Sequence, residues 1–104
     1  MRNENKLIIK AKKLKNDYKF DEALHIFENV DEKNQDYYRL KAECYYQDLK
    51  IPTKKRFSEA LQLLEIKDDN KPQETLRLKG AVCKRKYQHS KDIKDLYRAI
   101  QYYE

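Results

Sequence analysis

The sequence predicts an all-α protein built from three stacked antiparallel helical hairpins, six helices in all. The first observation is composition: the 104-residue chain has one Gly and two Pro, too few for the tight turns of a β-rich fold. The second is a stripe of bulky residue, alanine and two further bulky residues at i, i+3, i+4 and i+7, which forms one apolar face of an α-helix. The chain contains this stripe three times: Phe20, Ala23, Leu24 and Phe27; Phe57, Ala60, Leu61 and Leu64; Leu96, Ala99, Ile100 and Tyr103.

The third observation is the spacing of these copies. They start 37 and then 39 residues apart, which is the period of a helical-hairpin repeat. A second internal match agrees with it, because residues 39–42 (Arg-Leu-Lys-Ala) recur as residues 77–80 (Arg-Leu-Lys-Gly). Ala42 and Gly80 occupy the position of Ala11 in the first hairpin, where a tiny side chain lets one helix lie close to the next.

Each hairpin has its own boundary residues. The first hairpin spans about residues 5–30. Asn16 and Asp17 end its first helix, and Lys19 or Asp21 opens its second.

The second and third hairpins carry helix-start signals. The second spans about residues 35–66, and Thr53 can cap its second helix. The third spans about residues 72–104, with Pro72 in the first turn of a helix. Ser90 is the candidate N-cap of the last helix.

Length and composition limit the chain to a single helical domain, residues 1–104, with a modest core. Hydrophobic residues make up 39% and charged residues 40%, which suits a thin stack of helices with solvated outer faces. No run approaches the roughly 20 apolar residues of a membrane span, and residues 1–6 lack the apolar core of a signal peptide. We therefore expect a cytoplasmic protein with no membrane partner, in which Cys44 and Cys83 are reduced and half-buried.

Charge is unevenly distributed along the chain. Lys and Arg exceed Asp and Glu by five in residues 1–20 and by five in residues 71–104, whereas acids exceed bases by four in residues 21–70. Basic ends that flank an acidic middle favour an acidic partner, head-to-tail self-association or nucleic acid, although solvated lysine faces produce the same pattern. The basic runs 54–56 and 84–86, together with nine tyrosines that can stack on bases, keep nucleic acid as the alternative partner.

The first hairpin resembles the tetratricopeptide repeat. Ala11 and Ala23 lie twelve residues apart, and Phe20 and Phe27 flank the second alanine as they do in that repeat. The second and third hairpins depart from it, because the corresponding spacing grows to eighteen and nineteen residues. Their first helix or the loop between their helices is therefore longer. The resemblance implies a right-handed superhelix of hairpins.

The third hairpin is similar to a narrower family. Residues 74–85 (Glu-Thr-Leu-Arg-Leu-Lys-Gly-Ala-Val-Cys-Lys-Arg) and residues 95–103 (Asp-Leu-Tyr-Arg-Ala-Ile-Gln-Tyr-Tyr) resemble the divergent tetratricopeptide region of the TRAFs-binding domain family. That family is known in stress-activated protein kinase kinase kinases and in bacterial conflict-system proteins. The resemblance covers residues 7–104 as repeats and about residues 72–104 at the narrower level. It implies a scaffold that binds proteins and has no catalytic activity.

In such a stack the first helix of each hairpin lines the concave wall. Helical spacing around the three small residues then indicates nine candidate partner-binding residues: Ile8, Lys12, Lys15, Arg39, Glu43, Tyr46, Arg77, Ala81 and Lys84. Arg39 and Arg77 occupy equivalent positions roughly 10 Å apart, and two guanidiniums suit carboxylates or phosphates held bidentately. Tyr46 would add a flat apolar anchor. The alternative is that both arginines pair with neighbours such as Glu43 and Glu74.

The sequence carries no motif of an enzyme or cofactor site. His25 and His89 have no second His or Cys at metal-ligand spacing. The single Gly excludes a phosphate-cradling glycine loop, and Ser58 and Ser90 lack the sharp glycine turn of a nucleophile elbow. We expect no catalysis, no cofactor and no bound metal.

The last residues, Tyr102-Tyr103-Glu104, are not followed by the polar capping helix that stacked repeats usually need. We therefore expect either that the chain is part of a longer protein or that this end meets another subunit or partner, self-association included. The predicted function is a non-catalytic module that binds a partner segment in the concave groove, with acidic segments as candidates. The alternative is a small basic helical protein that binds nucleic acid.

Overall fold

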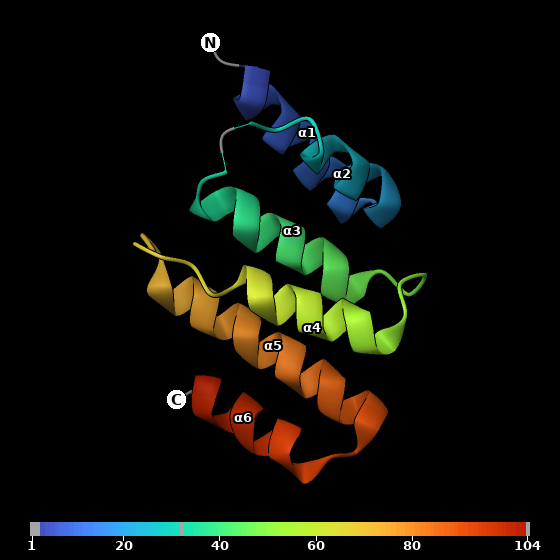
Figure 1. Cartoon of the computed structure of the whole chain (residues 1–104), viewed down its shortest axis with the longest axis vertical. Helices are drawn as coiled ribbons and strands as arrows, with labels where there is room; N and C mark the ends of the chain where they lie inside the picture. The colour runs from blue at the N-terminus through green and yellow to red at the C-terminus, as the bar shows by residue number, and fades with distance from the viewer. Residues whose placement is uncertain (1–2, 32, 104) are drawn as a thin grey trace.

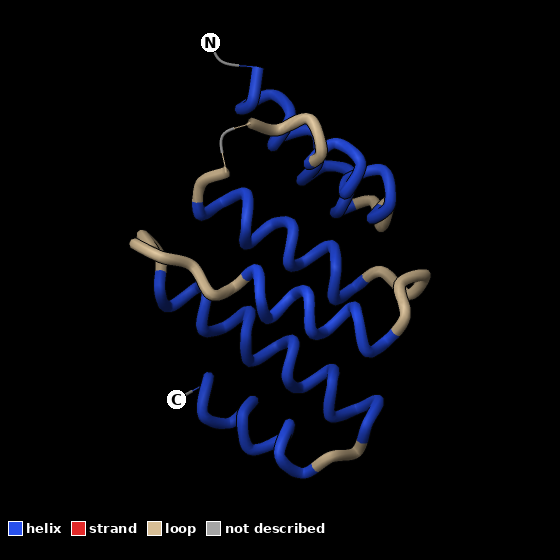
Figure 2. Tube along the Cα trace, viewed as in Figure 1, coloured by secondary structure: helices blue, strands red, loops and turns tan. Residues whose placement is uncertain are grey.

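Six α-helices form the secondary structure of the computed structural model, which describes residues 3–31 and 33–103 (Figure 1). Within those residues there is no β-strand (Figure 2). The helices are α1 (Asn3–Asn16), α2 (Phe20–Phe27), α3 (Gln35–Gln47), α4 (Thr53–Leu63), α5 (Pro72–Ser90) and α6 (Ile93–Tyr103). The predicted all-α fold of tetratricopeptide-like hairpins is confirmed.

The hairpins are stacked along the long axis of the molecule, with α1 and α2 at one end and α6 at the other (Figure 1). Within the hairpins α1 packs on α2, α3 on α4 and α5 on α6, while α2 packs on α3 and α4 on α5 between hairpins. The helix α3 also contacts α1 and α5, whereas α2 and α4 do not touch each other in the described part of the chain. The first helices of the hairpins therefore form one continuous wall, called here the inner wall (α1, α3 and α5).

The core follows the repeated stripe in the first two hairpins, whereas in the third Ala99 is buried but Ile100, predicted on the apolar face, is 46% exposed. The small residues at the positions predicted for close helix contact are all buried: Ala11, Ala23, Ala42, Ala60, Gly80 and Ala99. One apolar cluster around Phe27 joins α1, α2 and α3, and a second around Phe57 and Leu64 joins α3, α4 and α5. Because α3 contributes to both clusters, the middle hairpin fixes the position of the other two.

Helix boundaries agree with the sequence at some positions and differ at others. The helix α1 ends at Asn16, as predicted. Thr53 does not cap α4, because it is already the first helical residue. Ser90 is the last residue of α5 and not the N-cap of α6. Its hydroxyl accepts a hydrogen bond from the Asp92 backbone N–H at 3.1 Å and donates to Asp95 Oδ2 at 3.0 Å, which secures the turn between the two helices.

The close contact at Ala60 provides a test of the packing. Ala60 is completely buried on α4, so a leucine there would force neighbouring side chains and helices apart. We expect Ala60→Leu to lower the free energy of unfolding by about 1–3 kcal/mol, as measured by urea unfolding followed by circular dichroism. Ser58→Leu, at an exposed position of the same helix, is the control and should change it by less than about 0.5 kcal/mol. Equal effects of the two substitutions would contradict close packing at Ala60.

Candidate partner-binding groove

All nine residues predicted to bind a partner lie on the helices of the inner wall, three on each helix. The helix α1 carries Ile8, Lys12 and Lys15, α3 carries Arg39, Glu43 and Tyr46, and α5 carries Arg77, Ala81 and Lys84. Ile8 is half-buried against the first apolar cluster, and Lys12 is exposed. The residues do not form one uniform surface, because two side-chain contacts between neighbouring helices divide the wall.

The first contact joins α1 to α3. Lys15 and Glu43 form an ion pair in which both side chains are largely shielded, with exposed fractions of 16% and 20%. Each side chain faces the other and leaves little surface for a partner. This junction therefore presents little net charge and links the first hairpin to the second.

The second contact joins α3 to α5. The Arg85 guanidinium lies over the ring of Tyr46, with 5.8 Å between Cζ and the ring centroid, which is a cation–π geometry. Burial raises the pKa of Tyr46, so its hydroxyl stays protonated and can donate a hydrogen bond.

A depression of about 500 Å³ lies beside this contact, and we call it the Tyr46 depression. Its lining residues are Tyr46, Ala81, Lys84, Arg85, Gln88 and His89. Three of them, Tyr46, Ala81 and Lys84, are predicted groove residues that the structure brings together. The prediction missed Arg85 and Gln88. The signal for both was present, because residues 81, 84, 85 and 88 follow the i, i+3, i+4, i+7 spacing of one helix face.

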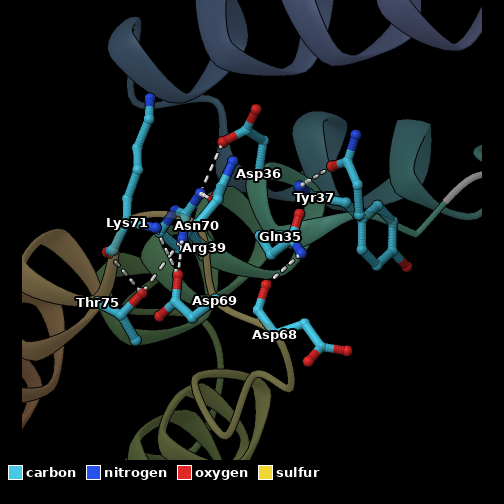
Figure 3. Close-up of polar contacts among 10 residues, drawn as sticks. Gln35, Asp36, Tyr37, Arg39, Asp68, Asp69, Asn70, Lys71 and Thr75 are labelled. Atoms are coloured by element: carbon cyan, nitrogen blue, oxygen red, sulfur yellow. Dashed lines mark hydrogen bonds and ion pairs between the residues drawn. The ribbon is translucent and has the colours of Figure 1, made fainter.

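Arg39 is placed differently from the prediction. Its side chain is only 4% exposed, and its guanidinium donates hydrogen bonds to acceptors from α3, α5 and the link between α4 and α5 (Figure 3). The acceptors are Asp36 Oδ1 at 2.9 Å, Asp69 Oδ1 at 2.7 Å, Asn70 Oδ1 at 2.9 Å and Thr75 Oγ1 at 3.2 Å. We call Arg39 with these four residues the Arg39 cluster.

Arg77 has the opposite setting, although it is the equivalent residue one hairpin later. It is exposed and forms no ion pair with any residue in the described part of the chain. The two guanidiniums are therefore not presented side by side. The carboxylates that pair with Arg39 are Asp36 and Asp69 rather than Glu43.

The link that follows α4 supplies acceptors to Arg39 because it folds back onto the start of α3. Asp68 takes a φ of 53°, and its carbonyl oxygen accepts a hydrogen bond from Gln35 Nε2 at 2.8 Å (Figure 3). Asp69 Oδ1 also accepts from the Lys71 backbone N–H at 3.0 Å, which orients its carboxylate. These residues fall between the second and third predicted hairpins, and a pairing across about thirty residues leaves no local pattern from which it could be predicted.

Asp69 makes the Arg39 cluster sensitive to acid. Burial alone raises the pKa of Asp69, but the Thr75 hydroxyl, the Lys71 N–H and the Arg39 guanidinium together lower it below its usual value of 3.8. A carboxylate with a lowered folded-state pKa contributes stability that is complete above its unfolded pKa. That stability is lost as the pH falls through the folded value.

We therefore expect the free energy of unfolding to fall as the pH is lowered below about 4, and to fall less steeply in Asp69→Asn. Urea unfolding at a series of pH values measures both slopes. Asp21→Asn is a useful comparison, because the pKa of Asp21 is also lowered, by the Glu22 backbone N–H and by Lys50, but on an exposed surface. Identical slopes for wild type and Asp69→Asn would exclude Asp69 as a source of the acid sensitivity.

A second buried arginine lies next to His89, one of the residues that line the Tyr46 depression. Arg56 on α4 is 2% exposed. Its Nη1 lies 3.4 Å from the carbonyl oxygen of Asp48, and its Nη2 lies 3.4 Å from Nε2 of His89. The guanidinium Cζ is 4.8 Å from the centroid of the Phe57 ring, and Nε has no hydrogen-bond partner among the described residues. The guanidinium therefore lies behind His89, outside the lining of the depression.

The two basic runs are less exposed than the sequence indicates. Arg56 is the buried member of the run 54–56. In the run 84–86, Lys86 is half-buried and pairs with Asp95 at 3.6 Å. Each run therefore presents two basic side chains to solvent in place of three, which weakens the case for a nucleic-acid surface.

Comparison with known families classifies the chain. The model of the family described as TPR-S, Tetratricopeptide Repeats-Sensor, matches residues 13–104. The chain belongs to the TPR-S family. The prediction of a divergent tetratricopeptide-type protein is thereby confirmed. No curated protein and no solved structure matches the chain.

Membership of the TPR-S family indicates the general role. Tetratricopeptide-type repeats generally mediate protein–protein interaction and are generally non-catalytic. In this TPR-S chain, the described residues hold no group of three His, Cys, Asp or Glu side chains placed to bind a metal ion. Among the same residues, none of the helices has the length and apolarity that crossing a lipid bilayer requires.

The two cysteines of the TPR-S chain are free thiols, and they are fully buried rather than half-buried as predicted, because both face the helix contacts of the core. Burial raises the pKa of Cys44 to about 12 and also raises the pKa of Cys83. Both thiols are therefore protonated at neutral pH, whereas the thiolate is the reactive form. Their role is to fill space in the core.

Proposed function

We propose that the inner wall of this TPR-S chain binds a segment of a partner protein without catalysing a reaction on it. The observation that carries the proposal is the Tyr46 depression, where three predicted groove residues from two hairpins line one hollow. A hollow between neighbouring repeats can hold a side chain of an extended segment, and Tyr46 offers it a flat apolar anchor.

The charges of the wall favour an acidic segment. Lys12, Arg77, Lys84 and Arg85 are exposed and form no ion pair with any described residue. Lys15 and Glu43 neutralise each other between α1 and α3. The free cations therefore dominate the wall, and a segment that carries carboxylates or other anions would complement them.

The experiment blocks the hollow without changing the fold. Ala81 is a half-exposed small residue in the depression, so Ala81→Arg fills it and keeps the positive character of the wall. Ser58→Arg adds the same side chain to the exposed surface of α4. Tagged wild type, Ala81→Arg and Ser58→Arg are used to capture proteins from native cells, which are then identified by mass spectrometry.

We expect one or more proteins to be retained by wild type and Ser58→Arg and lost from Ala81→Arg. Retention by all three would contradict binding at the inner wall. Co-purification of nucleic acid, with binding that weakens steeply as salt is raised, would support the alternative of a nucleic-acid partner instead.

A specific observation favours a further contact surface on α6. Ile93, Tyr97 and Ile100 are spaced i, i+4 and i+7 and are about half exposed, at 51%, 60% and 46%. They form one apolar face on the outer side of the last hairpin. Self-association through this face would appear in sedimentation as a dimer that Tyr97→Lys dissociates, and a concentrated wild-type monomer would exclude it.

A further inference from the structure

We infer that the Tyr46 depression is a phosphate-binding site, and that it takes the phosphate group of a phosphorylated side chain on the bound partner segment. The second half of this inference rests on the proposed function, since it requires a partner segment on the inner wall. The first half concerns the depression alone. Three features carry it: the hydrogen-bond donors of the depression, the absence of balancing acids, and a buried cation beside it.

The donors come from one face of α5. Lys84, Arg85 and Gln88 line the depression with side chains that donate hydrogen bonds, and Tyr46 lines it from α3. Arg85 is held in place by its contact with the Tyr46 ring. A phosphate group has three terminal oxygens that accept charge-assisted hydrogen bonds from such donors.

The charge of the depression is not balanced by any residue that lines it. Within the described residues, neither Asp nor Glu lines it, and neither Lys84 nor Arg85 forms an ion pair. The nearby acid Asp48 lines a separate depression on the other side of Arg85, and its carboxylate accepts from the Lys50 backbone N–H. Two uncompensated cations suit a dianion, and a phosphate monoester carries about −1.5 to −2 charges at neutral pH.

Arg56 is a third cation nearby, and it forms no ion pair with any residue that the structure describes. Buried charges are normally paired with an opposite charge, yet Arg56 contacts a carbonyl oxygen, an imidazole ring and an aromatic ring. Arg56 Nη2 lies 3.4 Å from Nε2 of His89, and His89 lines the depression. Arg56 therefore lies behind one lining residue and adds positive charge on that side of the depression.

This arrangement distinguishes phosphate from a partner carboxylate. A carboxylate has one negative charge and two oxygens, which Arg85 alone can satisfy in a bidentate pair. Lys84 would then remain uncompensated. A phosphate monoester has three terminal oxygens and nearly two negative charges, which match Lys84 and Arg85 together, so we assign the site to a phosphorylated side chain rather than to Asp or Glu.

The first experiment tests the depression with inorganic phosphate at constant ionic strength. Binding is followed by the ¹H–¹⁵N spectrum of the whole chain, in wild type and in Lys84→Gln/Arg85→Gln. The control is Lys10→Gln/Lys13→Gln, which removes the same charge from exposed positions on α1, a helix that does not contact α5.

We expect phosphate to shift the signals of α5 around Gln88 and His89, and the Lys84→Gln/Arg85→Gln variant to bind at least about tenfold more weakly. The affinity of the control variant for phosphate should stay within about twofold of the wild-type affinity, because it loses only long-range electrostatic attraction. Arg56→Met should remain folded and bind several-fold more weakly. Equal affinities for wild type and Lys84→Gln/Arg85→Gln, or an equal loss in the control, would overturn the site.

The second experiment tests where the phosphate group comes from. Proteins captured by wild type but not by Ala81→Arg are treated with phosphatase and captured again. Loss of capture after phosphatase treatment supports the inference. Release of the captured proteins by free phosphoserine, but not by serine, supports it as well. Unchanged capture would overturn the assignment to a phosphorylated partner while leaving the proposed function intact. If Ala81→Arg captures the same proteins as wild type, the proposed function is contradicted. The titration with inorganic phosphate would still test whether the depression binds phosphate.

Discussion

Replacing Arg39 by methionine is expected to lower the free energy of unfolding by about 2–4 kcal/mol, because it removes the cation of a partly buried ion pair together with its hydrogen bonds. The Arg39 side chain is 4% exposed and that of Asp69 is 14% exposed, so Asp69 would be left with little solvent and without its cation. Asn70 and Thr75 would lose the same donor. Urea unfolding near neutral pH measures the loss.

Arg77→Met is the matched control for Arg39→Met. It makes the same substitution at the equivalent position of the next hairpin, where the guanidinium is exposed. Its effect should stay within about 0.5 kcal/mol. Similar losses in the free energy of unfolding for both variants would show that the Arg39 cluster is not the source of the stability. A negligible loss in Arg39→Met would directly contradict a stabilising role of the cluster.

Replacing Arg56 by methionine is expected to have the opposite effect to Arg39→Met and to raise the free energy of unfolding by about 1–4 kcal/mol. A buried charge without an opposite charge costs desolvation energy that an apolar side chain of similar volume does not. Methionine can also keep a contact with the Phe57 ring. The variant loses only two contacts at 3.4 Å, to the Asp48 carbonyl and to His89.

Lys55→Met is the control for Arg56→Met, because Lys55 is its exposed neighbour on α4. Its free energy of unfolding should stay within about 0.5 kcal/mol of the wild-type value. A clear loss of stability in Arg56→Met would mean that its contacts with Phe57 and Asp48 outweigh the cost of desolvation. A gain in stability together with weaker phosphate binding would show that Arg56 contributes to phosphate binding at a cost in the stability of the fold. Only that combination supports both the energetic argument and the phosphate site.

The hairpin architecture could be predicted because it depends on local spacing. The i, i+3, i+4, i+7 stripe and its period of 37 to 39 residues determine which helix face is apolar and where the next hairpin begins. The small residues Ala42, Ala60 and Gly80 were placed correctly in helix contacts for the same reason. Caps were predicted less well, since Thr53 and Ser90 each start or end a helix without capping the one expected.

The candidate site could be predicted only in part, because the setting of a charged side chain depends on residues far away in the sequence. Arg39 and Arg77 share the same local sequence, yet only Arg39 meets the link that carries Asp69 and Asn70. Arg56 was expected among exposed basic residues, and it is buried because the end of α5 brings His89 over it. Tyr46, Ala81 and Lys84 line one depression because helix spacing places them on adjoining faces of α3 and α5.

The position of α3 has a consequence for how the molecule opens. The first and third hairpins touch α3 or its partner helix and do not touch each other in the described residues. In a linear array of this kind each unit depends only on its neighbours. The terminal hairpins can therefore fray independently of one another, whereas loss of the central one separates the whole molecule. Amide protons of α3 should accordingly exchange with solvent more slowly than those of the other helices, because α3 opens only when the whole array unfolds.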